Sequence, residues 1–252
     1  MKRYELTKEQ WERVKAVLPP ERTGKRGRPW KDDRKMLNGM LWIARSGAQW
    51  RELPEAYGPW QSVYARFSKW RDDGTLEAIF HALSADADME NLSLDSTCIK
   101  VHESANGGGK TANKAVGRTR GGLNTKLHAI VDGLGYPVEF MLSAGNDHDS
   151  VHAVELLEKV EISGSNVLAD RAYGAKAIRA YISEQGASYV IPPQSNISEP
   201  WPVDWWLYKE RHLVECFFQK LKWFRRIATR YDKLDASFLA FVYLASIAIL
   251  LI

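Results

Sequence analysis

The sequence contains only two cysteines, Cys98 and Cys216, and neither belongs to a CxxC pair. No spacing of cysteine and histidine suits zinc, so neither a disulfide framework nor a structural zinc site is indicated. The strongly apolar stretch 237–252 is shorter than the roughly 18 residues of a membrane span, and we expect a buried helix there. The N-terminus is charged and lacks the apolar core of a signal peptide. These absences predict a protein of a reducing cytoplasm with no membrane partner.

An excess of charge of one sign is also nearly absent. Lysine and arginine total 35 against 31 acidic residues, which gives a net charge of +4 and a pI near 8.9. Such a balance permits a polyanionic partner without requiring one, so the placement of the basic residues matters more. A chain of 252 residues can hold a small domain joined to a medium one. We predict a helical domain over residues 1–88 and an α/β domain over residues 89–252.

The N-terminal part has a helical period, with helices expected over residues 6–18, 32–45 and 60–72. The last of these is apolar on one side and basic on the other, which fits the recognition helix of a helix-turn-helix; an ordinary three-helix bundle is the alternative. The basic, glycine-containing segment after Pro20 is either a solvated loop or an arm for the DNA minor groove. The residues predicted to contact DNA here are Arg26, Arg28, Gln61, Arg66 and Lys69.

From Glu90 the period changes to the alternation of a β-strand, and Asp95 lies in the middle of NLSLDSTCIKVH. An aspartate inside a strand costs desolvation unless a partner compensates its charge. A glycine-rich basic loop, residues 103–122, follows. Its GGGKT lacks the first glycine of a P-loop, so contacts from Arg118 and Arg120 to DNA phosphates are the preferred interpretation.

The order of elements after residue 90 predicts the fold. A hairpin about the turn 132–135 is followed by helix, strand ending at Asp170, helix, strand and further helices. This order matches a ribonuclease-H-like α/β fold, in which the first strand lies beside the strand that ends at Asp170. Asp95 and Asp170 are therefore expected to meet on neighbouring strands.

A long amphipathic helix is predicted over residues 205–226. At 100° per residue, one narrow stripe collects Tyr208, Arg211, Glu215, Gln219, Lys222 and Arg226, while the opposite side is apolar. The stripe is either a solvated face with weak ion pairs or part of a site. If Glu215 leans toward Asp95 and Asp170, the three carboxylates can hold two Mg²⁺ ions, with Mn²⁺ as a substitute, for displacement at a phosphodiester.

Four other candidate site residues lie in the segment NDHDS and shortly after it. Asp147 and Asp149 stand where a helix N-terminus is expected, and capping explains them. His148 and His152 have the spacing of helical metal ligands but lack a third ligand for zinc.

The run Tyr208, Arg211, Glu215 and Lys222 resembles the Y(2)R(3)E(6)K signature of bacterial insertion-sequence transposases of the DDE class, most like the family numbered five. LSLDSTCIKVH resembles the first-aspartate block of that family and VLADRAYGAK the second. The similarity extends over nearly the whole chain, including LNGMLWIARSGAQWRELPEAYGPWQSVYARFSKW.

This resemblance implies that Asp95, Asp170 and Glu215 are catalytic and that Tyr208, Arg211 and Lys222 position a DNA end. It also implies cleavage at terminal inverted repeats, transfer of the freed end into target DNA, and a homodimer on DNA in the bacterial cytoplasm, associated with the nucleoid. A DNA-binding regulator that keeps the fold without turnover is the alternative.

Overall fold

The computed structural model describes residues 4–18, 32–106 and 115–252 as a mixed α/β structure. The predicted arm with Arg26 and Arg28 lies outside the described residues, as does GGGKT at 107–111. Within the described parts, no helix is long and apolar enough to cross a membrane.

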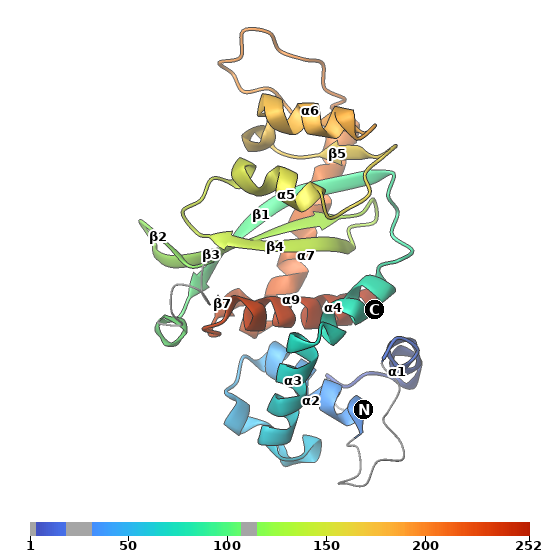
Figure 1. The fold of residues 1–252 in the computed structure, drawn as a ribbon, viewed down its shortest axis with the longest axis vertical. Helices are drawn as coiled ribbons and strands as arrows, with labels where there is room; N and C mark the ends of the chain where they lie inside the picture. Colours follow the sequence, from blue (N-terminus) through green and yellow to red (C-terminus); the bar gives the residue numbers. More distant parts are fainter. Residues whose placement is uncertain (1–3, 19–31, 107–114) are drawn as a thin grey trace.

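A mixed sheet forms the upper half of the molecule (Figure 1). Its central strand is β1, which pairs antiparallel with β3 on one side and parallel with β5 on the other. β4 pairs with β3 as the predicted hairpin, β2 pairs with the start of β3, and β6 extends the parallel side beyond β5. The short β7 pairs with the end of β1. The strands are β1 Asn91–Val101, β2 Gly117–Thr119, β3 Gly122–Val131, β4 Pro137–Ala144, β5 Asn166–Leu168, β6 Ser188–Val190 and β7 Thr229–Arg230.

The two faces of the sheet pack against different helices. Leu92 and Leu94 of β1 belong to a core with α5 (Ala153–Leu157) and α6 (Lys176–Glu184). Ile99 lies on the opposite face, in a core with α7 (His212–Lys222) and α9 (Asp235–Leu250). Because side chains alternate along a strand, Asp95 belongs to the α7 face and Ser96 to the α5 face.

In the described residues before the sheet there are four α-helices: α1 (Lys8–Lys15), α2 (Asp33–Ser46), α3 (Trp60–Asp72) and α4 (Thr75–Leu83). Their ends follow the sequence signals. Thr7 and Gln10 form the predicted capping box, and Gly47 ends α2 with φ 70°. A side chain at Gly47 would place its Cβ 2.9 Å from Cβ of Arg225, so glycine is needed there for the close approach of α2 to α8 (Arg225–Ala228) as well as for its backbone angle.

The N-terminal helices share one hydrophobic core with the C-terminal helices. Phe67 of α3 stacks on Phe241 of α9 with ring centroids 4.6 Å apart, and Phe80 of α4 contacts Tyr243 of α9 at 5.2 Å. α9 is buried on almost every side, as expected for the apolar stretch, because α2, α3 and α4 cover it below while the sheet and α7 lie above (Figure 1). The predicted boundary at residue 88 therefore does not separate two independent cores.

The prediction for α3 as a basic recognition helix is partly wrong. Arg66 forms an ion pair with Asp33, and their side chains are only 11% and 8% exposed, so Arg66 points into the structure. Gln61 is exposed, and the exposed Lys69 bonds Asp73 at 2.6 Å. The connection between α2 and α3, residues 47–59, contains two 3₁₀ turns and exceeds the three or four residues of a helix-turn-helix. The helix-turn-helix stays a prediction.

The predicted continuous helix over residues 205–226 is also wrong in its extent. Tyr208 and Arg211 lie in a 3₁₀ turn, Leu207–Arg211, before α7 begins. The chain becomes extended at Phe224, and Arg226 lies in α8. Arg226 leaves the stripe because its buried guanidinium donates to Asp232 at 3.0 and 2.8 Å. The stripe of a site is thus limited to residues 208–222.

Candidate active site

Asp95 lies in the middle of β1, where the sheet faces α7. Its carboxylate accepts the backbone N–H of Ser96 at 2.7 Å and a bond from Arg211 at 2.9 Å. The pKa of Asp95 is raised, chiefly by burial and further by the nearby charge of Asp170; the bonds from Ser96 and Arg211 act in the opposite direction. Arg211 is therefore a partner that compensates the aspartate, although its compensation is incomplete.

Asp170 follows the neighbouring strand. β1 and β5 run parallel with Ser93 opposite Leu168, and each aspartate lies two positions beyond its strand's paired residue. This register places Asp95 and Asp170 beside each other, in agreement with the effect of Asp170 on the pKa of Asp95. The Asp170 side chain accepts the N–H of Ala172 at 2.8 Å, which caps the 3₁₀ turn Arg171–Tyr173 and fixes the carboxylate at the strand end.

Glu215 reaches this group through Arg211. One guanidinium nitrogen of Arg211 bonds Oδ2 of Asp95, and the other bonds Oε1 of Glu215. The side chains of Arg211 and Asp95 are 18% and 19% exposed, whereas that of Glu215 is 51% exposed. The i, i+4 spacing brings Arg211 and Glu215 together at the start of α7, so the predicted stripe does converge on the sheet.

Lys222 contacts the same strand at the other end of α7. Its Nζ donates to Oγ1 of Thr97 at 2.6 Å. Thr97 lies two residues after Asp95 and therefore on the same face of β1. Strand alternation could have identified Thr97, but it was not among the predicted site residues. Tyr208 lies one turn before Arg211, against the ring of Trp205 at 5.7 Å. The signature residues therefore line one face of the structure.

The chemistry of the donors fits a hard divalent cation because all three candidate ligands are carboxylates. Their arrangement fits less well. No group of three or more His, Cys, Asp or Glu side chains in the described parts of the chain is placed to hold a metal ion. Arg211 lies between two of the acids, because its guanidinium bonds an oxygen of Asp95 and an oxygen of Glu215. Asp95 and Asp170 lie next to each other, whereas Glu215 is connected to Asp95 through the guanidinium of Arg211.

A second polar network lies on the opposite face of β1. Ser96 donates to Asp149 at 2.8 Å, and Lys126 of β3 donates to the same carboxylate oxygen at 2.6 Å. Capping is the wrong explanation for Asp149, because the side chain of His148 accepts the N–H of Ser150 at the start of this turn. Burial, and then the charges of three aspartates, raise the pKa of the nearby Tyr173. The capping pattern in the sequence gave no indication that Asp149 supports the strand that carries Asp95.

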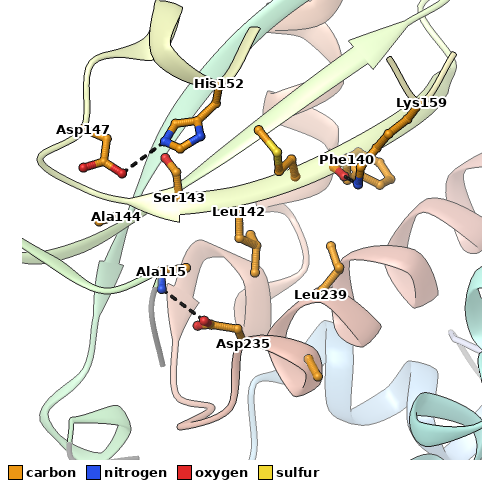
Figure 2. Close-up of a pocket in the computed structure, with 12 residues that line it drawn as sticks. Ala115, Phe140, Leu142, Ser143, Ala144, Asp147, His152, Lys159, Asp235 and Leu239 are labelled. Atoms are coloured by element: carbon orange, nitrogen blue, oxygen red, sulfur yellow. Dashed lines mark hydrogen bonds and ion pairs between the residues drawn. The ribbon is translucent and has the colours of Figure 1, made fainter. Parts of the chain in front are cut away.

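A pocket of about 380 Å³ lies between β4 and α9, and its lining includes none of Asp95, Asp170 and Glu215 (Figure 2). Figure 2 shows His152 pointing toward Asp147, and the two side chains are 3.1 Å apart. His148 instead contacts the hydroxyl of Ser150 at 2.8 Å. The two histidines thus have separate partners, and no third metal ligand joins them within the described residues.

The other predicted DNA contacts do not gather at the carboxylates. Arg118 and Arg120 are exposed, at and just after β2, which forms an outer end of the sheet (Figure 1). Gln61 and Lys69 lie on α3, on the other side of α9 from the sheet. The structure brings together Asp95, Asp170, Arg211 and Glu215, with Lys222 and Tyr208 beside them.

Comparisons with known proteins match two consecutive parts of the chain. A family model assigned to transposases of the IS4/5 family (DUF4096) matches residues 6–80, and a model described as a transposase DDE domain matches residues 86–200. A curated protein of Brucella ovis, assigned as the transposase for insertion sequence element IS6501, is 44% identical over 124 residues, which are 49% of this chain and 95% of that protein. The uncharacterized protein y4sN of Sinorhizobium fredii is 40% identical over 102 residues, 40% of this chain and 81% of that protein.

Two solved structures are distantly similar. A cryo-EM structure of the piggyBac transposase synaptic complex with hairpin DNA has a TM-score of 0.41 and 12% identity, over 75% of this chain and 47% of that one. The chain thus spans about half the length of the piggyBac chain. A crystal structure of a pre-cleavage Mos1 transpososome has a TM-score of 0.28 and 15% identity, over 96% of this chain and 85% of that one.

Proposed function

Because the chain belongs to the insertion-sequence transposases that carry a DDE domain, we propose that it binds the terminal inverted repeats of its element and catalyses Mg²⁺-dependent strand cleavage and strand transfer. The strand order β4-β3-β1-β5-β6, with the short β2 also paired to β3, supports a ribonuclease-H-like fold in this proposal. The observation that carries the proposal is the meeting of Asp95, Asp170 and the Arg211–Glu215 pair at one place on this sheet.

In this proposal, Asp95, Asp170 and Glu215 supply the oxygen ligands of the metal ions. Bound Mg²⁺ would activate the attacking oxygen and stabilise the leaving oxygen of the phosphodiester. The protein fixes the two aspartates rigidly, one within a central strand and one at a strand end. Glu215 is more exposed and joins them from a helix that packs on the same face of the sheet.

Cationic and aromatic side chains beside the carboxylates would hold the DNA end. Lys222 and Arg211 offer donors to phosphate oxygens, and Tyr208 offers a hydroxyl and a ring at the entrance of α7. Arg118 and Arg120 would extend the contact along the outer sheet, and Gln61 and Lys69 would act at the N-terminal helices. Since synapsis of two DNA ends usually requires more than one protomer, a homodimer on DNA is part of the proposal.

The test is a nicking assay on a duplex that carries the inverted repeat flanking the gene. The unaltered protein should nick the duplex with Mg²⁺ or Mn²⁺. Asp95→Asn should remove nicking while the duplex is bound with roughly unchanged affinity, because phosphate contacts dominate binding. Binding without nicking by the unaltered protein would identify a DNA-binding regulator instead, and absence of both would contradict the proposal.

A further inference from the structure

The guanidinium of Arg211 lies between two of the three proposed metal ligands. Its Nη1 is 2.9 Å from Oδ2 of Asp95, and its Nη2 bonds Oε1 of Glu215. Both bonds are charge-assisted, and the Arg211 side chain is only 18% exposed, so this position is well defined by packing as well as by charge. Arg211 thus links a buried strand residue to a half-exposed helix residue.

The N–H of Ser96 and Arg211 occupy the two carboxylate oxygens of Asp95, and Arg211 also occupies Oε1 of Glu215, so a divalent cation would have to share these oxygens with hydrogen-bond donors. Mg²⁺ takes oxygen ligands at about 2.0–2.1 Å in a near-octahedral shell, which would bring it next to the guanidinium. The two positive charges would repel each other at a place where water screens them incompletely. This repulsion opposes metal binding at Asp95 and Glu215 for as long as Arg211 keeps both of its bonds.

A DNA phosphate is a suitable alternative acceptor for the guanidinium. Arginine binds phosphate and carboxylate with the same bidentate fork. The neighbouring Lys222 lies on the same face and bonds the uncharged hydroxyl of Thr97, so it can bind a phosphate without releasing a carboxylate. On this face, Arg211 is therefore bonded to carboxylates, whereas Lys222 is not.

We propose that Arg211 is a two-position side chain that competes with the divalent cation for Asp95 and Glu215 and is drawn to the phosphate backbone when DNA binds. DNA and metal then bind cooperatively, since each favours the position of Arg211 that the other needs. The protein consequently loads metal poorly until a DNA end is in place. This inference rests on the proposed function and adds a mechanism that controls metal binding at its site.

The experiment measures metal affinity rather than cleavage. Binding of Mn²⁺ to the full chain is followed by the EPR signal of the free ion, with and without a duplex that already carries the nicked end. Arg211→Ala should bind Mn²⁺ at least about fivefold more tightly than the unaltered protein without DNA, the lower end of usual coupling factors. The duplex should raise the affinity of the unaltered protein by a similar factor and that of Arg211→Ala by much less.

Lys222→Ala is the matched control, because it removes a cation from the same face of the structure without freeing a carboxylate. It should weaken DNA binding, as Arg211→Ala does, but leave the Mn²⁺ affinity of the DNA-free protein unchanged. Arg211→Lys keeps a charge but loses the fork, and an intermediate Mn²⁺ affinity is expected. Circular dichroism shows whether Arg211→Ala folds. If it does not fold, Arg211→Lys takes its place in the experiment.

The outcomes separate this inference from the function on which it rests. Equal or weaker Mn²⁺ binding by the Arg211 variants, in a protein that nicks its inverted repeat, overturns the competition and leaves the transposase intact. An equal gain in affinity for Lys222→Ala also overturns it, because the effect would then be general electrostatics. If the unaltered protein neither binds Mn²⁺ with DNA nor nicks, the proposed function itself fails.

Discussion

Asp95→Asn should inactivate the protein and at the same time stabilise it. The pKa of Asp95 is raised, first by burial and also by Asp170, so the folded state holds the ionised carboxylate unfavourably despite the bonds from Ser96 and Arg211. An amide has nearly the same shape and no charge. A residue that the proposed function requires is therefore one that the isolated fold disfavours, as is common at active sites.

The sign and size of this effect follow from the environment. The folded pKa of such a carboxyl group lies above its unfolded pKa, which is about 3.9. Its favourable contribution to the free energy of unfolding is fully present below the unfolded pKa and is lost as the pH rises through the folded pKa. Single substitutions usually change stability by about 0.5–3 kcal/mol. An amide oxygen can still accept the 2.9 Å bond from Arg211, so we expect a gain of about 1 kcal/mol, or roughly 2–4 °C in Tm for a domain of this size.

The assay is thermal unfolding without added metal, at several pH values between about 4 and 8. The gain in Tm should be full near neutral pH and should shrink as the pH falls toward 4, because protonation of Asp95 in the unaltered protein removes its buried charge. Glu215→Gln is the control: it also removes a carboxylate bonded to Arg211, but the Glu215 side chain is 51% exposed, so no comparable gain is expected. A lower Tm for Asp95→Asn at neutral pH would refute the reasoning.

Three further predictions concern the fold. Deletion of residues 1–73 should abolish cooperative unfolding, seen by calorimetry, because it uncovers the apolar surface of α9. Gly47→Ala should destabilise the protein by about 1 kcal/mol or more in urea titrations, because it combines a positive φ with a Cβ 2.9 Å from Arg225. The pKa of the buried His128 is lowered to about 4, chiefly by desolvation, so stability should fall as the pH drops from about 6.5 toward 4. The fall should be smaller in His128→Gln if the protein tolerates this change.

Local signals predicted the elements near the site well. The alternation around Asp95 indicated a strand, and the turn at residues 132–135 indicated the hairpin; both are present. The capping box at Thr7 and the glycine at 47 also placed helix ends correctly. These features depend on a few neighbouring residues, whose periodicity and turn chemistry are visible in the sequence.

Partners distant in sequence could not be predicted in this way. Arg66 and Arg226 appeared to be surface cations, but each is paired with an aspartate inside the structure. Helical periodicity predicts which side a residue takes, and it cannot foresee that an acid from another segment will neutralise it. The break at Phe224 has the same origin, because tertiary packing of α8 and α9 overrides the helical pattern.

The shared core connects the two parts of the chain physically. α7 carries Glu215 on one side and buries Val214, Phe217 and Leu221 on the other, in the same core that holds α2, α3 and α4. A shift of the N-terminal helices would therefore act on the helix that positions Glu215, since packed interiors transmit displacements. Contacts of DNA with the N-terminal helices and with Arg211 would then act on one mechanical unit, so recognition of an end and assembly of the carboxylates need not be separate events.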